Sequence, residues 1–491
     1  MPAAQNQIPP ARVARQGALL FSGFALAQAM SFARNAIVAH WLSKGDFGIA
    51  AAILLLLQLL ETLSDLGADR LIVQARDGEE PRLIATAHAT LVLRGVLTAL
   101  ALVLIAQPMA AFFRIPDAQW AFSAAALVPF IKGFVHLDSR IAQRHLDNRP
   151  QMLIETLPQI TGVVLVVPMI WLFADYAAVL WLSVLQAVAV VIVSHAMAAR
   201  AYRIAFDRAY LTRLIAFGWP IWASAFPLIA VYQGDRILIG RFMGMEGLAA
   251  YTAAFMMTMV PGLIAAKVAN ALMLPLLAVE RDAPQRFASR YRLMAEATAL
   301  AAALYLTAFI IGGGAILPLA FGSNYVGLGT LVGWLALMWS MRMLQAVPGA
   351  ALLAKGVTRP FLIAGIVRSA GLLLAFAALS HGFGLEGVAA AGALAEFASL
   401  VYVVVCLDRL SLENNAHSRH RLGTILAMRG LLLAPAGTLA LLAAHQSAGD
   451  LALFDAATAM LAVALAVTAL AAVMMPDSKR ELRAIYGAGQ R

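Results

Sequence analysis

The sequence predicts an all-α protein that crosses a membrane about fourteen times, and three observations support this fold class. First, 62% of the 491 residues are hydrophobic and only 13% are charged, whereas about 25% of residues are charged in a typical soluble protein. Second, apolar runs recur along the whole chain, and each is long enough to span a hydrocarbon core of about 30 Å. Third, these runs are continuous and lack the alternation that a transmembrane β-barrel requires.

The predicted spans follow one another through short, turn-like connections, and no soluble domain is inserted between them. We expect the first span to be uncleaved, because its apolar segment is too long for the core of a signal peptide. The approximate limits of the spans are 17–41, 47–69, 84–106, 119–143, 151–173, 177–199, 214–242, 247–279, 293–319, 326–352, 360–380, 387–407, 423–444 and 451–475.

A weak internal repeat divides the chain into two predicted lobes. The segments 33–52 and 234–253, offset by 201 residues, both place a charged residue in an apolar helix ahead of a turn marked by glycine or serine. Two parallel repeats of six helices with pseudo-twofold symmetry would enclose a central cavity. The predicted parts are a cytoplasmic tail (1–16), an N-lobe of TM1–6 (17–200), a cytoplasmic linker (201–213), a C-lobe of TM7–12 (214–407), a second cytoplasmic linker (408–422), TM13–14 (423–475) and a cytoplasmic tail (476–491).

The distribution of charge predicts the orientation. The formal net charge is +10, and Lys and Arg collect in alternate loops together with both tails. The positive-inside rule therefore places both termini in the cytoplasm. Because position accounts for most of this charge, no nucleic-acid partner is implied, although the basic loops should attract anionic lipid headgroups.

Ionisable residues inside the predicted spans are the candidate functional residues, because charges at membrane depth are costly and usually face a cavity or a protein interior. Seven basic residues outnumber four acidic ones there, so a cavity that they lined would be electropositive and would suit an anionic ligand. The basic residues are Arg34, Lys132, Arg236, Lys267 and Arg342, together with Arg94 and Arg368; the acidic residues are Glu61, Asp65, Asp235 and Glu396.

Two carboxylates in the second span admit two explanations. Glu61 and Asp65 are four residues apart, so they should repel one another on a helix if both are ionised. A shared proton or cation would relieve this repulsion, which would make Glu61, Asp65 and also Asp235 candidates for ion coupling or gating. Alternatively, Asp65 simply pairs with Arg70 or with a neighbouring helix.

Several kinds of chemistry find no support in the sequence. There is no phosphate-binding G-x-x-x-x-G-K-[ST] loop and no H-E-x-x-H motif, and the single cysteine, Cys406, cannot form an internal disulfide. His136 and Asp138 lack a nucleophile that would complete a catalytic set, and we expect His88 and His195 to be interfacial or packed. We therefore expect a transporter without catalytic residues, metal or cofactor, with H⁺ or Na⁺ as a possible coupling ion.

The motifs around the repeat resemble those of a known family. The Leu-x-x-x-[Asp/Glu]-[Phe/Tyr]-Gly turn is present as Leu42–Gly48, and an Asp-Arg pair at 235–236 precedes Gly244. In these features the chain resembles the polysaccharide (O-antigen repeat-unit) flippases of the multidrug/oligosaccharidyl-lipid/polysaccharide (MOP) exporter superfamily. It departs from the pattern at Ala249, where the family often has glycine.

The resemblance implies a function that the composition alone does not. It implies two six-helix lobes that open alternately to the two sides of the bacterial cytoplasmic membrane and flip a polyprenyl-diphosphate-linked oligosaccharide to the outer leaflet for surface polysaccharide synthesis. Partners would be membrane lipids and the polysaccharide polymerase and chain-length machinery. TM13–14 are usual in the polysaccharide branch, and diphosphate oxygens would suit the basic residues.

Three alternatives to this function were weighed. A cation-coupled multidrug exporter of the same superfamily would usually stop at twelve helices. A membrane-embedded glycan polymerase would need catalytic groups on a long outer loop, and a scaffold would not need basic residues at membrane depth. Within the flippase hypothesis, the repeat sets Arg34 opposite Asp235, so we expect these two residues to bridge when the cavity is closed to the outside.

Overall fold

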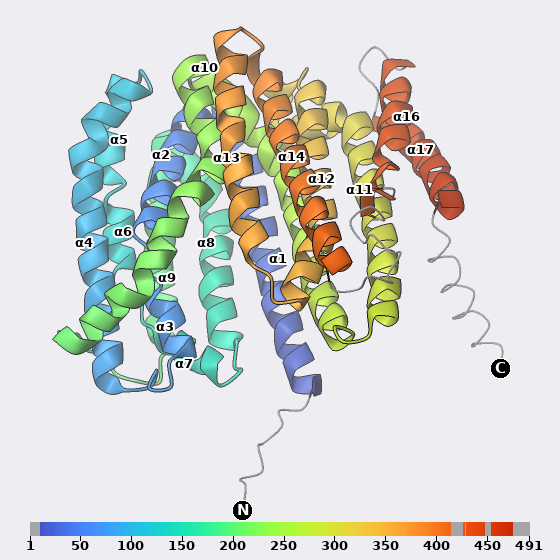
Figure 1. Ribbon diagram of the computed structural model, residues 1–491. Coiled ribbons are helices and arrows are strands. Elements are labelled where there is room, and N and C mark those ends of the chain that lie inside the picture. The colour runs from blue at the N-terminus through green and yellow to red at the C-terminus, as the bar shows by residue number, and fades with distance from the viewer. Residues whose placement is uncertain (1–9, 414–425, 428, 447–452, 475–491) are drawn as a thin grey trace, which may run out of the picture. The chain divides into compact units, whose positions relative to one another are not determined.

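The computed structural model describes residues 10–413, 426–427, 429–446 and 453–474, and in these ranges the regular elements are all helices (Figure 1). Its contacts separate two compact units. Unit 1 comprises Met1–Ile229 and Met243–Ala249, and unit 2 comprises Ala230–Phe242 and Ala250–Arg491. The division falls inside one long helix, and the lobe limits expected from the sequence stay a prediction.

Unit 1 is built from the first nine α-helices and part of the tenth. Helix α8 packs against α1 and α9, while α4 packs against α5 and α6, and α6 also contacts α9. The bounds are α1 (Pro10–Trp41), α2 (Lys44–Leu63), α3 (Ala68–Gln74), α4 (Pro81–Phe112), η1 (Pro116–Ala118), α5 (Gln119–Ala124), α6 (Leu127–Lys132), α7 (Asp138–Arg144), α8 (Arg149–Phe173), α9 (Ala177–Ala196) and the start of α10 (Arg208–Val279).

Helix α2 starts and ends at recognisable signals. Its N-cap residue Ser43 accepts a hydrogen bond from the backbone N–H of Asp46 at 3.0 Å, which satisfies a free donor of the first turn. At the other end Asp65 accepts the backbone N–H of Gly67 at 3.0 Å, and Gly67 has φ 63°. The expectation that one helix covers 47–69 is therefore wrong at its end, because an Asx turn and a left-handed glycine stop the helix.

The fourth predicted span is also interrupted. The segment 119–143 contains α5, α6 and α7 rather than one helix. Pro129 lies in the middle of this segment, and proline both lacks the N–H that a helix needs and clashes with the preceding turn. Residues 133–137, which lie between α6 and α7, leave room for side chains from neighbouring helices.

Helix α10 bends at Gly244, where the backbone has φ 74° and ψ −171°. Only glycine adopts such a conformation without strain, and the spans expected at 214–242 and 247–279 lie on either side of it. The next residue, Met245, packs against the first turn of α2. A Cβ atom on Gly48 would overlap the carbonyl oxygen of Met245, so the two turns that the internal repeat equates touch each other within unit 1.

Unit 2 is a second helical bundle. Helix α12 packs against α11 and α14, α13 packs against α14, and α16 and α17 both pack against α11. Its interior contains the fully buried side chains of Trp339, Tyr291 and Tyr251. The remaining bounds are α11 (Pro284–Phe321), η2 (Ser323–Tyr325), α12 (Gly329–Ala354), α13 (Arg359–Ser380), α14 (Gly384–Glu413), α16 (Leu433–Gln446) and α17 (Leu453–Met474).

The helices are those of a multi-pass membrane protein. Within the described residues, 8 helices are long and apolar enough to cross a membrane, and one of them, α10, covers two of the expected spans. The start of the expected span 423–444 lies outside the described residues. The all-helical membrane fold is thus confirmed, while the count of fourteen spans stays a prediction.

A buried ion pair attaches the C-terminal helices to unit 2. Glu296 in α11 is fully buried, and its Oε1 lies 3.2 Å from Nη2 of Arg429, which precedes α16. Glu296 lies near the start of the predicted span 293–319, and the packing of α16 and α17 against α11 accounts for its burial. Removing one member of a buried pair leaves an uncompensated charge and is strongly destabilising.

We predict that Arg429→Ala lowers the free energy of unfolding by about 3–5 kcal/mol. The exposed pair Arg281–Asp282 provides the control, since Arg281→Ala should cost about 0–1 kcal/mol. Denaturant titration of the purified protein in detergent measures both. Equal losses in the two variants would show that the Glu296–Arg429 pair does not anchor the C-terminal helices.

Candidate functional site

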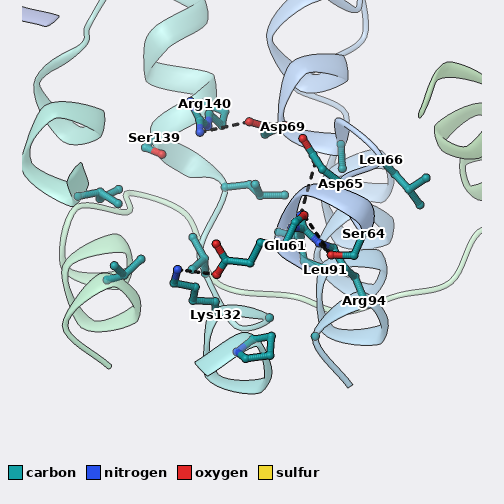
Figure 2. A pocket seen from close by; sticks show the side chains of 18 of the residues that line it. Glu61, Ser64, Asp65, Leu66, Asp69, Leu91, Arg94, Lys132, Ser139 and Arg140 are labelled. Atoms are coloured by element: carbon teal, nitrogen blue, oxygen red, sulfur yellow. Dashed lines mark hydrogen bonds and ion pairs between the residues drawn. The ribbon is translucent and has the colours of Figure 1, made fainter. Parts of the chain in front are cut away.

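A charged pocket of about 750 Å³ lies inside unit 1 (Figure 2). Helices α2, α3, α4, α6, α7 and α8 and the break after α2 contribute to its lining. Because most of these helices are otherwise apolar, the concentration of polar side chains here is a feature of the site rather than of the bundle. The charged lining residues are Glu61, Asp65, Asp69 and Glu155, and Arg70, Arg94, Lys132 and Arg140.

Lys132 and Glu61 form the shortest ion pair of the pocket. Nζ of Lys132 lies 2.6 Å from Oε1 of Glu61, and the two side chains are 39% and 33% exposed. Lys132 is the last residue of α6, and Glu61 is near the end of α2. The helix breaks after both elements therefore bring these two charges into the cavity, where solvent and a ligand could reach them.

Arg94 holds the broken end of α2. From the middle of α4 its Nη2 donates to the carbonyl oxygen of Glu61 at 2.9 Å, and its Nε donates to Oγ of Ser64 at 3.0 Å. Its Nη1 also lies 3.6 Å from Asp65. A cation that bonds free carbonyls at a helix C-terminus is favourably placed with respect to the helix dipole.

Two further ion pairs lie in the lining of the pocket. Arg70 lies 3.2 Å from Asp65, and Arg140 of α7 lies 3.2 Å from Asp69 of α3. The pocket thus holds four acidic and four basic side chains. The excess of positive charge that we expected in a central cavity does not occur in this pocket, because the carboxylates on the α2–α3 segment match the cations.

The contacts also decide how Asp65 is stabilised. Asp65 lies outside the helix, beyond its C-cap residue Ser64, so Glu61 and Asp65 do not form the helical i, i+4 pair that we expected. Asp65 pairs with Arg70 and with Arg94 of the neighbouring helix α4. Of the two explanations considered from the sequence, the one with basic partners matches these contacts, and the coupling role of both carboxylates stays a prediction.

Arg34 lies elsewhere in unit 1. Its Nη1 donates to Oε1 of Gln186 in α9 at 2.6 Å, and Gln186 in turn donates to the carbonyl oxygen of Pro158 in α8 at 3.0 Å. This amide gives the buried guanidinium a neutral partner. Asp235 belongs to unit 2, and its expected bridge to Arg34 stays a prediction.

The Asp-Arg pair of α10 is held by aromatic residues within unit 2. The hydroxyl of Tyr251 donates to Oδ2 of Asp235 at 2.5 Å, and the Arg236 guanidinium lies 4.4 Å from the centroid of the Phe255 ring. Such a cation–π contact provides a partner in an apolar setting. The Arg236 guanidinium therefore has a partner within unit 2.

Three of the other deep charges form one cluster in unit 2. Glu396, 3% exposed, accepts from Nε of Arg342 at 2.5 Å and lies 3.1 Å from Nε of Arg368. Arg342 also lies between the rings of Tyr232 and Trp339, at 4.9 and 4.7 Å. Arg342 is therefore largely enclosed by protein, whereas Lys267 of α10 is exposed, and the assignment of both residues to substrate binding stays a prediction.

Sequence reasoning identified part of the pocket and missed the rest. Lys132, Glu61 and Asp65 were expected in a cavity, and they do line the pocket. Asp69, Arg70 and Arg140 were not expected in a cavity, because the predicted spans run without a break through residues 69 and 143. The Asp65-x-Gly67 sequence is a turn signal that could have placed this break.

We predict that Arg94→Ala destabilises unit 1 by about 1–3 kcal/mol, because it leaves partly buried acceptors unsatisfied. Arg70→Ala, at a residue whose side chain is 57% exposed, is the control and should cost about 0–1 kcal/mol. Thermal unfolding of the purified variants compares them. Similar midpoints for the two variants would contradict the role of Arg94 at the end of α2.

The comparisons with known proteins identify a family by sequence and a shared fold by structure. The family described as "Polysaccharide biosynthesis protein" matches residues 37–328. Among solved structures, the lipid II flippase MurJ in an inward closed conformation matches with a TM-score of 0.70 and 12% identity, over 92% of this chain and 98% of that one. An inward-facing multidrug resistance MATE family transporter of the MOP superfamily matches with a TM-score of 0.59 and 16% identity, over 81% and 96%.

No curated protein matches the chain. At these identities the solved structures show a shared fold only. The family match, in contrast, covers more than half of the sequence, and the fold has the helical architecture seen in MOP transporters. The chain therefore belongs to the polysaccharide biosynthesis protein family and has the fold of the MOP exporter superfamily.

Proposed function

We propose that the protein flips a polyprenyl-diphosphate-linked oligosaccharide from the cytoplasmic to the outer leaflet by alternating access. The observation that carries this proposal is the pocket of unit 1, where four basic side chains and several hydrogen-bonding groups face a cavity among membrane-spanning helices. Polar pockets at this depth mark substrate pathways. The membership of a polysaccharide biosynthesis family supports a glycan as the cargo.

The diphosphate is the part of such a substrate that the pocket suits best. Phosphate oxygens form strong, charge-assisted hydrogen bonds with guanidinium and ammonium groups. In the structure, Lys132 and Arg94 contact Glu61 and Asp65 instead. A bound diphosphate would take the place of these carboxylates, so substrate binding in this proposal is an exchange of one anion for another.

This exchange gives Glu61 and Asp65 a defined part in coupling. A carboxylate that loses its basic partner inside an apolar bundle is costly in its ionised form. Binding of a proton or of a sodium ion would offset that cost. We therefore propose that Glu61 takes up a coupling ion when the diphosphate binds to Lys132, and releases it when the substrate leaves.

The size of the pocket limits what it can hold. Its volume of about 750 Å³ is in the usual range of about 300–1,000 Å³ for small-molecule sites. The diphosphate and the first sugars fit this volume, with Gln151, Gln159 and Ser139 available to hydroxyl groups. A polyprenyl chain does not, so in this proposal the lipid remains in the bilayer.

The cellular setting follows from the same proposal. A substrate made at the cytoplasmic leaflet places the protein in the bacterial cytoplasmic membrane with both termini inside, as the basic loops indicate. Delivery to the outer leaflet would bring it near the polysaccharide polymerase and chain-length machinery.

A multidrug exporter is the second candidate. The fold similarity to a MATE family transporter and the presence of carboxylates in the pocket favour it, because carboxylates attract cationic drugs. Deleting the gene separates the two functions. Lipid-linked oligosaccharide retained in the inner leaflet supports the flippase, whereas normal surface glycan with increased drug sensitivity supports the exporter.

We predict that Lys132→Ala lowers export of the lipid-linked oligosaccharide about 10–100-fold. The loss of one charge-assisted contact is about 1.5–3 kcal/mol, and about 1.4 kcal/mol corresponds to a factor of ten. Arg34→Ala and Lys267→Ala should also impair export at unchanged protein level. Arg286→Ala, at an exposed residue, is the control.

A double variant tests the assignment of Lys132 to the diphosphate. If Lys132 only neutralises Glu61, then Lys132→Ala with Glu61→Gln removes both charges and should restore export. If Lys132 binds the diphosphate, the double variant stays defective. Export is measured as surface glycan in a strain that lacks the chromosomal gene, and restored export in the double variant would contradict the proposal.

A further inference from the structure

A histidine cluster lies in unit 1 beside the charged pocket, and its member His136 lines both that pocket and a second cavity. The rings of His88 in α4 and His136 between α6 and α7 have centroids 5.0 Å apart, and His195 of α9 lies 5.4 Å from His136. Tyr202, in the non-helical segment 197–207 that joins α9 to α10, packs against all three rings at 4.4, 5.6 and 5.1 Å.

The hydrogen bonds of two histidines define their protonation. Nε2 of His88 accepts the backbone N–H of Leu137 at 3.1 Å, so Nδ1 carries the proton and donates to the carbonyl oxygen of Arg203 at 3.0 Å. Nδ1 of His136 accepts the N–H of Asp138 at 3.1 Å, so Nε2 donates to the carbonyl oxygen of Arg200 at 3.1 Å. Both rings are therefore neutral, and each holds one carbonyl of the connecting segment.

Two more contacts fix the same segment. The N–H of Ala199 donates to Oδ2 of Asp138 at 2.7 Å, and the N–H of Ala205 donates to the carbonyl oxygen of Ala85 at 3.3 Å. Beneath the segment is a cavity of about 470 Å³ lined by both histidines. Both rings are buried while the segment is in place, at 1% exposed for His88 and 2% for His136, and the cavity gives the segment space into which it can move.

We propose that His88 and His136 form a pH-sensitive latch that holds the segment 197–207 onto unit 1 when both rings are neutral and releases it when they are protonated. Protonation puts an N–H on the ring nitrogen that now accepts a backbone N–H, so two donors face each other. The ring must turn to relieve this, and its other nitrogen then loses the carbonyl of Arg200 or Arg203. The latch is closed at neutral pH, where both rings are neutral, and opens on acidification, when the rings take up protons.

Some of the charged groups around the rings favour protonation of the histidines, and others oppose it. Asp138 favours protonated His136 and is available to it once Ala199 has moved away, whereas His195 and the arginines of the segment oppose added positive charge. Tyr202 stays neutral, because burial raises the pKa of its phenol. The groups that face the cluster are Glu79, Asp138, His195, Arg200, Tyr202 and Arg203, and His145 and Arg144 reach Glu79.

Glu79 remains charged while the histidines titrate. Partial burial raises its pKa, but the positive charges and hydrogen bonds of His145 and Arg200 outweigh that effect and hold the pKa of Glu79 below its ordinary value. The change in charge between neutral and acidic pH therefore belongs to the histidines. The positive-inside rule predicts that this segment faces the cytoplasm, so the latch would respond to cytoplasmic acidification.

Spin-label mobility tests the latch in the full chain. A nitroxide on Ala201→Cys, in a Cys406→Ser background and reconstituted in liposomes, should be immobile at neutral pH and become mobile as the pH falls below the ordinary histidine pKa of about 6.5. If opening takes up two protons, the ratio of mobile to immobile label should rise by up to about 100-fold for each unit by which the pH falls. If it takes up one proton, the rise should be up to about tenfold. A label whose mobility does not change with pH would overturn the proposal.

Three variants identify the groups responsible. His88→Gln and His136→Gln should each reduce the number of protons linked to opening from two to one. The double variant should remove the pH dependence of label mobility. His195→Gln is the matched control, because its ring touches Tyr202 but bonds to Val191 of its own helix. The proposal is contradicted if label mobility still changes with pH in the double variant, or if both single variants keep the full steepness of that change. It is also contradicted if His195→Gln abolishes the change.

Discussion

Pairing of charges inside an apolar helical bundle is the constraint on which the structure of the site depends. A charge at membrane depth persists only with a partner that offsets its desolvation. In unit 1, Lys132 is paired with Glu61 and Arg94 with the end of α2, and in unit 2 Arg342 and Arg368 share Glu396. The carboxylates are thus as much a part of the site as the cations, although an excess of cations first pointed to an anionic substrate.

This balance changes how a transporter of this kind can bind an anion. A pocket of unpaired cations would hold a diphosphate tightly and would be costly to empty. In a pocket whose cations already have internal partners, the net free energy of binding is only the difference between the contacts that the cations make with the new anion and those that they give up. Weak net binding suits a carrier, which has to release its cargo on the far side of the membrane as readily as it takes it up. The breaks after α2 and α6 matter because they let the partners reach one another.

The sequence predicted the fold class well and the site in part. Apolar length located the helices, since a span must cover the hydrocarbon core, and ionisable residues at depth located Lys132, Glu61 and Asp65. The prediction of uninterrupted helices from hydropathy was wrong where a local signal ends a helix inside an apolar segment. Gly67 and Pro129 interrupt two such segments, and the breaks bring Asp69 and Arg140 into the pocket. The sequence also could not show which charged residues form ion pairs. Glu396 is 54 residues from Arg342, and only the fold brings such distant residues together. His88 was expected to be interfacial or packed, and His136 was considered only as part of a catalytic set. Neither expectation could include their hydrogen bonds to backbone groups, because backbone partners leave no mark in a sequence.

The bend of α10 has a topological consequence. Residues 243–249 belong to unit 1, whereas 230–242 and the chain from 250 onward belong to unit 2. The main chain therefore crosses from one unit to the other three times, after residues 229, 242 and 249. Cutting the polypeptide in the loop before α10 would leave the whole of unit 2 on the second fragment, together with the residues of unit 1 from α10, including 243–249. Along the chain the two units are therefore interleaved, and unit 1 is complete only with a segment, residues 243–249, that is made after part of unit 2.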